Sequence, residues 1–75
     1  MEQAKKIFQE KLGERISLLR ENSGLTQTEL GLRCNKDRQS INRLERGNVN
    51  PSSYYLFEIS RALNVSLSEL VRIDL

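Results

Sequence analysis

The chain has no histidine and no tryptophan, and it contains a single cysteine, Cys34. One cysteine cannot form a disulfide within the chain, and protein zinc sites need several Cys or His ligands. The base that usually activates a serine or cysteine nucleophile, histidine, is missing too. The composition therefore argues against a bound metal ion or cofactor, and we expect a protein that is not an enzyme.

Long apolar segments are missing as well. No run approaches the roughly 18 residues that a membrane-spanning helix requires. The N-terminal segment mixes acids with bases and has no apolar signal-peptide core. Because an unpaired cysteine suits a reducing compartment, we expect a cytoplasmic protein without a membrane partner. Nothing in the sequence indicates a small-molecule ligand.

Positive charge is concentrated in the middle of the chain, although the formal net charge is only +2. Residues 33–46 include five basic and two acidic side chains, whereas residues 52–75 include two basic and three acidic ones. A local basic region of this kind is typical of a surface that contacts nucleic-acid phosphates.

Apolar residues recur at helical spacing, and no stretch alternates as a strand would. The pattern predicts five short helices, over residues 4–21, 26 to 33 or 34, 37–46, 51 or 52 to 64, and 66 to about 71. We expect a single domain over residues 1–75 with its core within about 12–71. The residues expected to face inward are Phe8, Leu12, Ile16, Leu19, Leu30, Cys34, Ile41, Leu44, Leu56, Ile59, Leu63, Leu67, Leu70 and Val71.

The predicted helix ends carry local signals. Thr26-x-x-Glu29 and Ser66-x-x-Glu69 match the capping box, in which two side chains satisfy each other's backbone N–H groups. Asp37 is a strong N-cap residue. Residues that tolerate the left-handed conformation follow three of the helices: Gly24, Asn35 and Gly47.

Five segments together resemble the Cro/repressor-type helix-turn-helix family, also known as the xenobiotic-response-element family. They are Leu-Gly-Glu-Arg-Ile at 12–16, Leu-Thr-Gln-Thr-Glu-Leu-Gly at 25–31, Asp-Arg-Gln-Ser-Ile-Asn-Arg-Leu-Glu-Arg-Gly at 37–47, Asn-Pro-Ser at 50–52 and Ala-Leu-Asn-Val-Ser-Leu-Ser-Glu-Leu at 62–70. The resemblance implies an all-α, lambda-repressor-like bundle of five helices, with the helix-turn-helix at the second and third. The chain departs from the family pattern at Gly31, Asn35 and Lys36, where Ala, Gly and a hydrophobic residue are usual.

On this resemblance, the helix over residues 37–46 is the recognition helix that enters the major groove. Helical geometry turns four polar side chains of this helix outward, and all are types that read base edges. The expected base-contacting residues are Arg38, Gln39, Asn42 and Arg43. The expected phosphate-contacting residues are Thr26, Gln27, Lys36, Ser40, Arg46 and Asn48. The alternative is an ordinary solvated helix face.

Two further features have a structural interpretation. The resemblance pairs Arg20 with Glu45 in a partly buried salt bridge that holds the third helix against the first. Tyr54 and Phe57 fall outside the inner face of the fourth helix, so they either pack against the first helix or form an exposed patch for self-association.

We therefore expect a sequence-specific transcriptional regulator, a repressor, that binds a two-fold symmetric operator in double-stranded DNA as a homodimer associated with the nucleoid. By resemblance, the dimer surface lies around the fifth helix and the loop before the fourth. Variants of this function are a restriction-modification controller, an antitoxin and a phage repressor. A protein-interaction module on the same fold is the alternative, since fold alone does not decide function.

Overall fold

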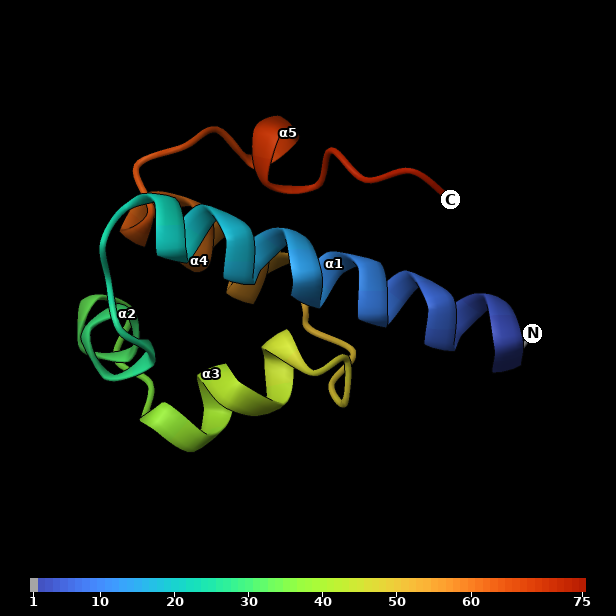
Figure 1. The fold of residues 1–75 in the computed structure, drawn as a ribbon, viewed down its shortest axis with the longest axis horizontal. Coiled ribbons are helices and arrows are strands. Elements are labelled where there is room, and N and C mark those ends of the chain that lie inside the picture. Colours follow the sequence, from blue (N-terminus) through green and yellow to red (C-terminus); the bar gives the residue numbers. More distant parts are fainter. Residues whose placement is uncertain (1) are drawn as a thin grey trace.

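The computed structural model describes residues 2–75, which form five helices and no strand. These are α1 (Glu2–Asn22), α2 (Gln27–Arg33), α3 (Arg38–Glu45), α4 (Ser53–Ala62) and α5 (Leu67–Leu70) (Figure 1). The predicted all-α fold class is confirmed, with every predicted helix present. α1 begins earlier than predicted, and α5 is a single turn. No helix in this described range is long and apolar enough to cross a membrane.

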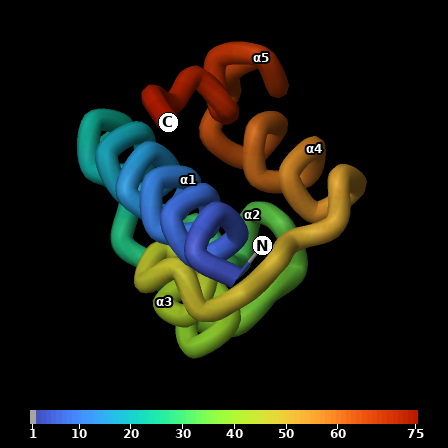
Figure 2. The backbone as a smooth tube through the Cα atoms, turned by 90° about the vertical axis from the view of Figure 1, so that its right-hand side faces the viewer, coloured from blue at the N-terminus to red at the C-terminus, as the bar shows by residue number. Residues whose placement is uncertain are grey.

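The helices pack around α1, which runs the length of the molecule (Figure 1). α3 contacts both α1 and α2, whereas α5 contacts α1 and α4. Figure 2 shows α3 on one side of α1 and the α4–α5 pair on the other. The α2–α3 unit therefore lies at one edge of the bundle.

The helix N-termini form largely as predicted. Thr26 Oγ1 accepts a hydrogen bond from Glu29 N (3.0 Å), and Glu29 Oε1 accepts one from Thr26 N (2.8 Å), which confirms the first capping box. Asp37 Oδ1 accepts from Ser40 N at 2.7 Å. At Ser66 the structure has only half of the predicted box, because its hydroxyl accepts from Glu69 N but no bond returns from the Glu69 side chain.

The left-handed residues also stand where they are predicted: φ is +74° at Gly24, +61° at Asn35 and +76° at Gly47. Gly31 is not in the left-handed conformation, and what requires glycine there is a close backbone contact. A Cβ placed there would overlap the carbonyl oxygen of Lys36, because the chain turns back so closely that Lys36 N donates to Gly31 O at 2.8 Å. The turn between α2 and α3 therefore depends on a missing side chain.

One compact core lies between the helices. Its buried hydrophobic residues are Leu12, Ile16, Leu30, Cys34, Ile41, Leu44, Ile59, Leu63 and Leu70, all of them predicted. Phe8, Leu19 and Leu56 are only partly buried. The prediction is wrong for Leu67 and Val71, which are 40% and 36% exposed. A one-turn helix presents a single side to the core, and Leu70 occupies it.

Candidate nucleic-acid interface

α2, the turn after it and α3 form two helices joined by a short connection at one edge of the bundle (Figures 1 and 2). Ile41 and Leu44 on the inner side of α3 are completely or almost completely buried. Arg38, Gln39 and Arg43 are exposed on the same helix. α3 is therefore sharply divided into an apolar side and a polar side, and its polar side faces solvent.

The four residues predicted to contact bases do not share one environment. Arg38, Gln39 and Arg43 are exposed, and among residues 2–75 none has a hydrogen-bond partner for its side chain. Asn42 is half-buried, and its Nδ2 lies 3.4 Å from Gln27 Oε1 on α2. Three of the side chains are thus free to meet a ligand, whereas the amide of the fourth is already oriented by a neighbour.

The residues predicted to contact phosphate lie around the edge of this polar side. Thr26, Lys36, Arg46 and Asn48 are exposed, and Gln27 and Ser40 are half-buried. They come from the start of α2, the turn, α3 and the loop after α3. Lys36 points away from the others, because its Nζ lies 4.9 Å from the centre of the Tyr55 ring on α4.

A largely buried ion pair joins α1 to the inner side of α3, and it is the pair that the resemblance predicts. Arg20 Nε and Nη2 donate to the two carboxylate oxygens of Glu45 at 2.6 and 3.0 Å. The side chains are only 12% and 6% exposed, and Arg20 Nη1 also donates to Leu25 O at 2.8 Å. The bond to Glu45 raises the pKa of Arg20. The pair ties the end of α3 to α1.

Gln27 extends this pair in a way that the sequence did not predict. Its Nε2 donates to Glu45 Oε1 at 3.0 Å, while its Oε1 accepts from Asn42. No local pattern signals these contacts, because the partners are 18 and 15 residues apart in the chain. The Gln27 amide nitrogen keeps a second hydrogen that these bonds leave free.

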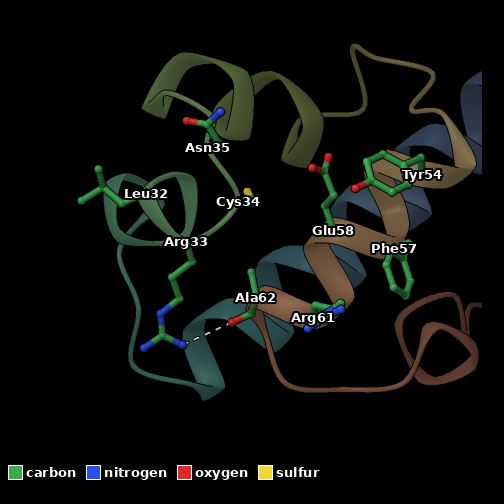
Figure 3. Close-up of a pocket in the computed structure, with 9 residues that line it drawn as sticks. All are labelled: Leu32, Arg33, Cys34, Asn35, Tyr54, Phe57, Glu58, Arg61 and Ala62. Carbon is green, nitrogen blue, oxygen red and sulfur yellow. Dashed lines mark hydrogen bonds between the residues drawn. The ribbon is translucent and has the colours of Figure 1, made fainter.

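A groove lies between the end of α2 and α4 (Figure 3). Tyr54 and Phe57 are exposed there, with ring centres 6.0 Å apart, rather than packed on α1. Arg33 Nη1 crosses to the Ala62 carbonyl oxygen at 3.2 Å, the dashed line in Figure 3. Of the two alternatives left open for these aromatic residues, the structure has the exposed patch.

Sequence comparison finds relatives that are named as transcriptional regulators. A helix-turn-helix family model matches residues 16–70. An uncharacterised HTH-type transcriptional regulator, y4dJ, from Sinorhizobium fredii is 42% identical over 60 residues, which are 80% of this chain and 78% of that protein. Another such regulator, from Archaeoglobus fulgidus, is 35% identical over 80% of this chain and 86% of its own length.

Solved structures show the same arrangement of helices. The restriction-modification controller protein C.AhdI from Aeromonas hydrophila aligns with a TM-score of 0.79 and 33% identity, covering 81% of this chain and 88% of the controller. The clp gene regulator ClgR from Corynebacterium glutamicum aligns with a TM-score of 0.82 and 28% identity, over 85% of this chain and 83% of that one.

Proposed function

Because the chain belongs to the helix-turn-helix family, whose matched members are transcriptional regulators, we propose that it binds a specific sequence of double-stranded DNA and represses transcription there. The observation that carries this proposal is the exposed polar side of α3, where Arg38, Gln39 and Arg43 are unpaired among residues 2–75, beside an apolar side that is fully packed. A helix with these properties at the edge of a bundle fits the major groove.

In this proposal the side chains of α3 read base edges. Arg38 and Gln39 stand at the N-terminal end of the helix, which normally reaches deepest into the groove. An arginine pairs bidentately with guanine, and an asparagine or glutamine with adenine. Asn42 and Arg43 follow on the same side, one turn further along.

The residues around α3 then contact the DNA backbone and set the position of the helix without reading sequence. Gln27 has one free amide hydrogen for a phosphate oxygen, and the Thr26 hydroxyl, which accepts from Glu29, still has its own hydrogen to donate. The remaining proposed phosphate contacts are Lys36, Ser40, Arg46 and Asn48. For Lys36 the contact requires the ammonium to leave the Tyr55 ring.

We propose that two copies act together on a two-fold symmetric site, with half-sites about one helical turn, or roughly 34 Å, apart. Support for a self-association surface comes from α5, where Leu67 and Val71 are exposed although apolar. A chain that works in this way is found at the nucleoid.

A restriction-modification controller is a second candidate, supported by the 33% identity to C.AhdI over most of both chains. Both candidates require sequence-specific DNA binding. A protein-interaction module would have no need of the unpaired polar side chains on α3.

The proposal is tested by selecting bound duplexes from a random DNA pool with the wild type and with Arg38→Ala. The wild type should enrich a two-fold symmetric site, and the variant should lose preference at one position per half-site, at a cost of about 1–3 kcal/mol. Arg61→Ala, an exposed arginine on α4 near the groove of Figure 3, is the matched control and should select the same site. Weak binding without any enriched sequence, falling steeply with salt, would leave only a phosphate contribution and contradict the proposal.

A further inference from the structure

An unbroken chain of four polar side chains runs from α1 to the polar side of α3. Arg20 is paired with Glu45, Glu45 accepts from Gln27 at 3.0 Å, and Gln27 accepts from Asn42 at 3.4 Å. We propose that the Arg20–Glu45 pair determines which end of the Asn42 amide faces DNA. Glu45, which is only 6% exposed, would then determine base specificity without touching DNA. This inference rests on the proposed function, because it concerns a base contact.

This series of hydrogen bonds has a direction because Arg20 and Glu45 each have a single hydrogen-bonding role. A guanidinium only donates, and an ionised carboxylate only accepts. Glu45 is held by two donors of Arg20, so it can only present an oxygen to Gln27. The side of the Gln27 amide that faces it must therefore be the nitrogen, as observed.

The orientation of the Gln27 amide in turn fixes that of Asn42. With its nitrogen toward Glu45, Gln27 turns its Oε1 toward α3, where only a donor fits. Asn42 consequently meets it with Nδ2, and its Oδ1 is left without a partner from this chain of contacts. An isolated asparagine amide on a helix surface has no such constraint, because its two ends are nearly equal in size and rotation exchanges them.

The direction of the amide has a consequence for base reading. A free Oδ1 accepts from an exocyclic amino group, which adenine and cytosine present in the major groove. The reversed amide would instead place Nδ2 against the carbonyl oxygen of guanine or thymine. The ion pair thus favours adenine or cytosine over guanine or thymine at the base pair that Asn42 Oδ1 contacts.

The experiment compares base preference at one position between the wild type and Glu45→Met. Methionine has no oxygen to accept from Gln27, so the amides of Gln27 and Asn42 lose the orientation that Glu45 gives them. We expect the ratio of Kd values for duplexes that differ only at the Asn42 position to fall by about tenfold toward no preference. Asn42→Ala identifies the position, because it loses preference there.

Two further variants separate this effect from a general loss of structure. Glu21→Gln removes the other carboxylate near Arg20, which lies 3.9 Å away outside the chain of contacts, and should leave the preference unchanged. Gln27→Met interrupts the chain while leaving the ion pair, and should reduce discrimination at the Asn42 position about tenfold without reversing it. Combining it with Glu45→Met should give the same preference as Gln27→Met alone.

Equal loss of affinity for all bases at that position in folded Glu45→Met, or unchanged preference in Gln27→Met, would overturn the inference. If Glu45→Met proves unfolded by circular dichroism, Gln27→Met alone decides in the same way. Failure of the wild type to select any site would instead contradict the proposed function. A selected site whose preference is the same in all variants would contradict only the role given to Glu45.

Discussion

At the scale of single residues, the arrangement depends on Arg20 and Glu45, two charged side chains that are largely buried and hydrogen-bonded to each other. Glu45 lies on α3, yet its side chain faces inward and belongs to the interior rather than to the surface. Burying an unpaired charge costs several kcal/mol, so the pair with Arg20 is a condition of the fold. Within the described residues 2–75, the exposed arginines of α3 have no such partner and remain available.

Glu45→Ala tests this difference. The variant leaves Arg20, whose side chain is only 12% exposed in the wild type, without its carboxylate partner. We expect a loss of about 3 kcal/mol in the free energy of unfolding. Glu58→Ala, on α4, removes a carboxylate that takes part in no ion pair among residues 2–75, and it should cost less than about 0.5 kcal/mol. Thermal unfolding of the two variants at one pH makes the comparison. Equal decreases in Tm would contradict the assigned role of the pair.

Asp37 makes stability depend on pH. Its bond from Ser40 N lowers the pKa of the Asp37 carboxyl. A carboxyl group whose pKa is lower in the folded state stabilises the protein above its unfolded pKa, near 4, and loses that contribution as the pH falls through the folded pKa.

We therefore expect the Tm difference between wild type and Asp37→Asn to be constant and in favour of the wild type above about pH 5, and to shrink below about pH 4. Asparagine is a good N-cap residue as well, so the helix itself should persist in the variant. The measurement is Tm against pH for both proteins. Asp74→Asn in the exposed tail is the control and should follow the wild type at all pH values. A difference that does not change with pH would argue against the contribution of Asp37.

At the scale of elements, short helices depend on what stands at their ends and on how closely they approach. α2 and α3 have seven and eight residues, and helices of this length are marginal without tertiary contacts. Thr26 and Asp37 cap them, and Asn35 in the left-handed conformation turns the chain between them. Gly31 completes the unit because the backbone of Lys36 lies where a Cβ would be.

Gly31→Ala should therefore destabilise the protein, although the same change in an open helix stabilises by about 1 kcal/mol. The added methyl group meets backbone rather than a flexible side chain, so we expect a net loss of about 1–3 kcal/mol and weaker DNA binding. Thr28→Ala, at an exposed position of α2, should change stability little. Chemical denaturation gives both values. Higher stability of Gly31→Ala would mean that the turn relaxes freely.

At the scale of the whole molecule, one edge is polar and basic, while apolar side chains are exposed elsewhere. Leu67 and Val71 come from α5, and Tyr54 and Phe57 from α4. Exposed apolar groups next to one another are typical of protein contact surfaces. This distribution agrees with the proposal that two copies bind DNA side by side.

If α5 forms the contact between copies, Leu67→Lys combined with Val71→Lys should shift the molecule toward the monomer. We expect at least a tenfold rise in the dimer dissociation constant, because charges would be buried in an apolar interface. Analytical ultracentrifugation over a range of concentrations measures it. Leu32→Lys, at a more exposed apolar position on α2, is the control. An unchanged dissociation constant would place the contact elsewhere.

The sequence by itself determined the helices, their ends and most of the core, because these follow from local physics. Periodicity, N-cap side chains and left-handed residues act within a few positions of the chain, and the resemblance added the order of the elements and the pairing of Arg20 with Glu45. The exposure of Leu67 and Val71 could not be predicted in this way. It depends on α5 being one turn long, which leaves room on the core for Leu70 alone.

Only the tertiary structure decided how the candidate site is internally connected. Periodicity indicates that Asn42 faces outward and Glu45 inward, but it does not indicate that Gln27 lies between them. That contact exists because α3 packs against both α1 and α2, so that Glu45 accepts from Arg20 and Gln27 together. The physical reason is that hydrogen bonds between distant side chains depend on the packing of whole helices, and that packing is a property of the assembled core.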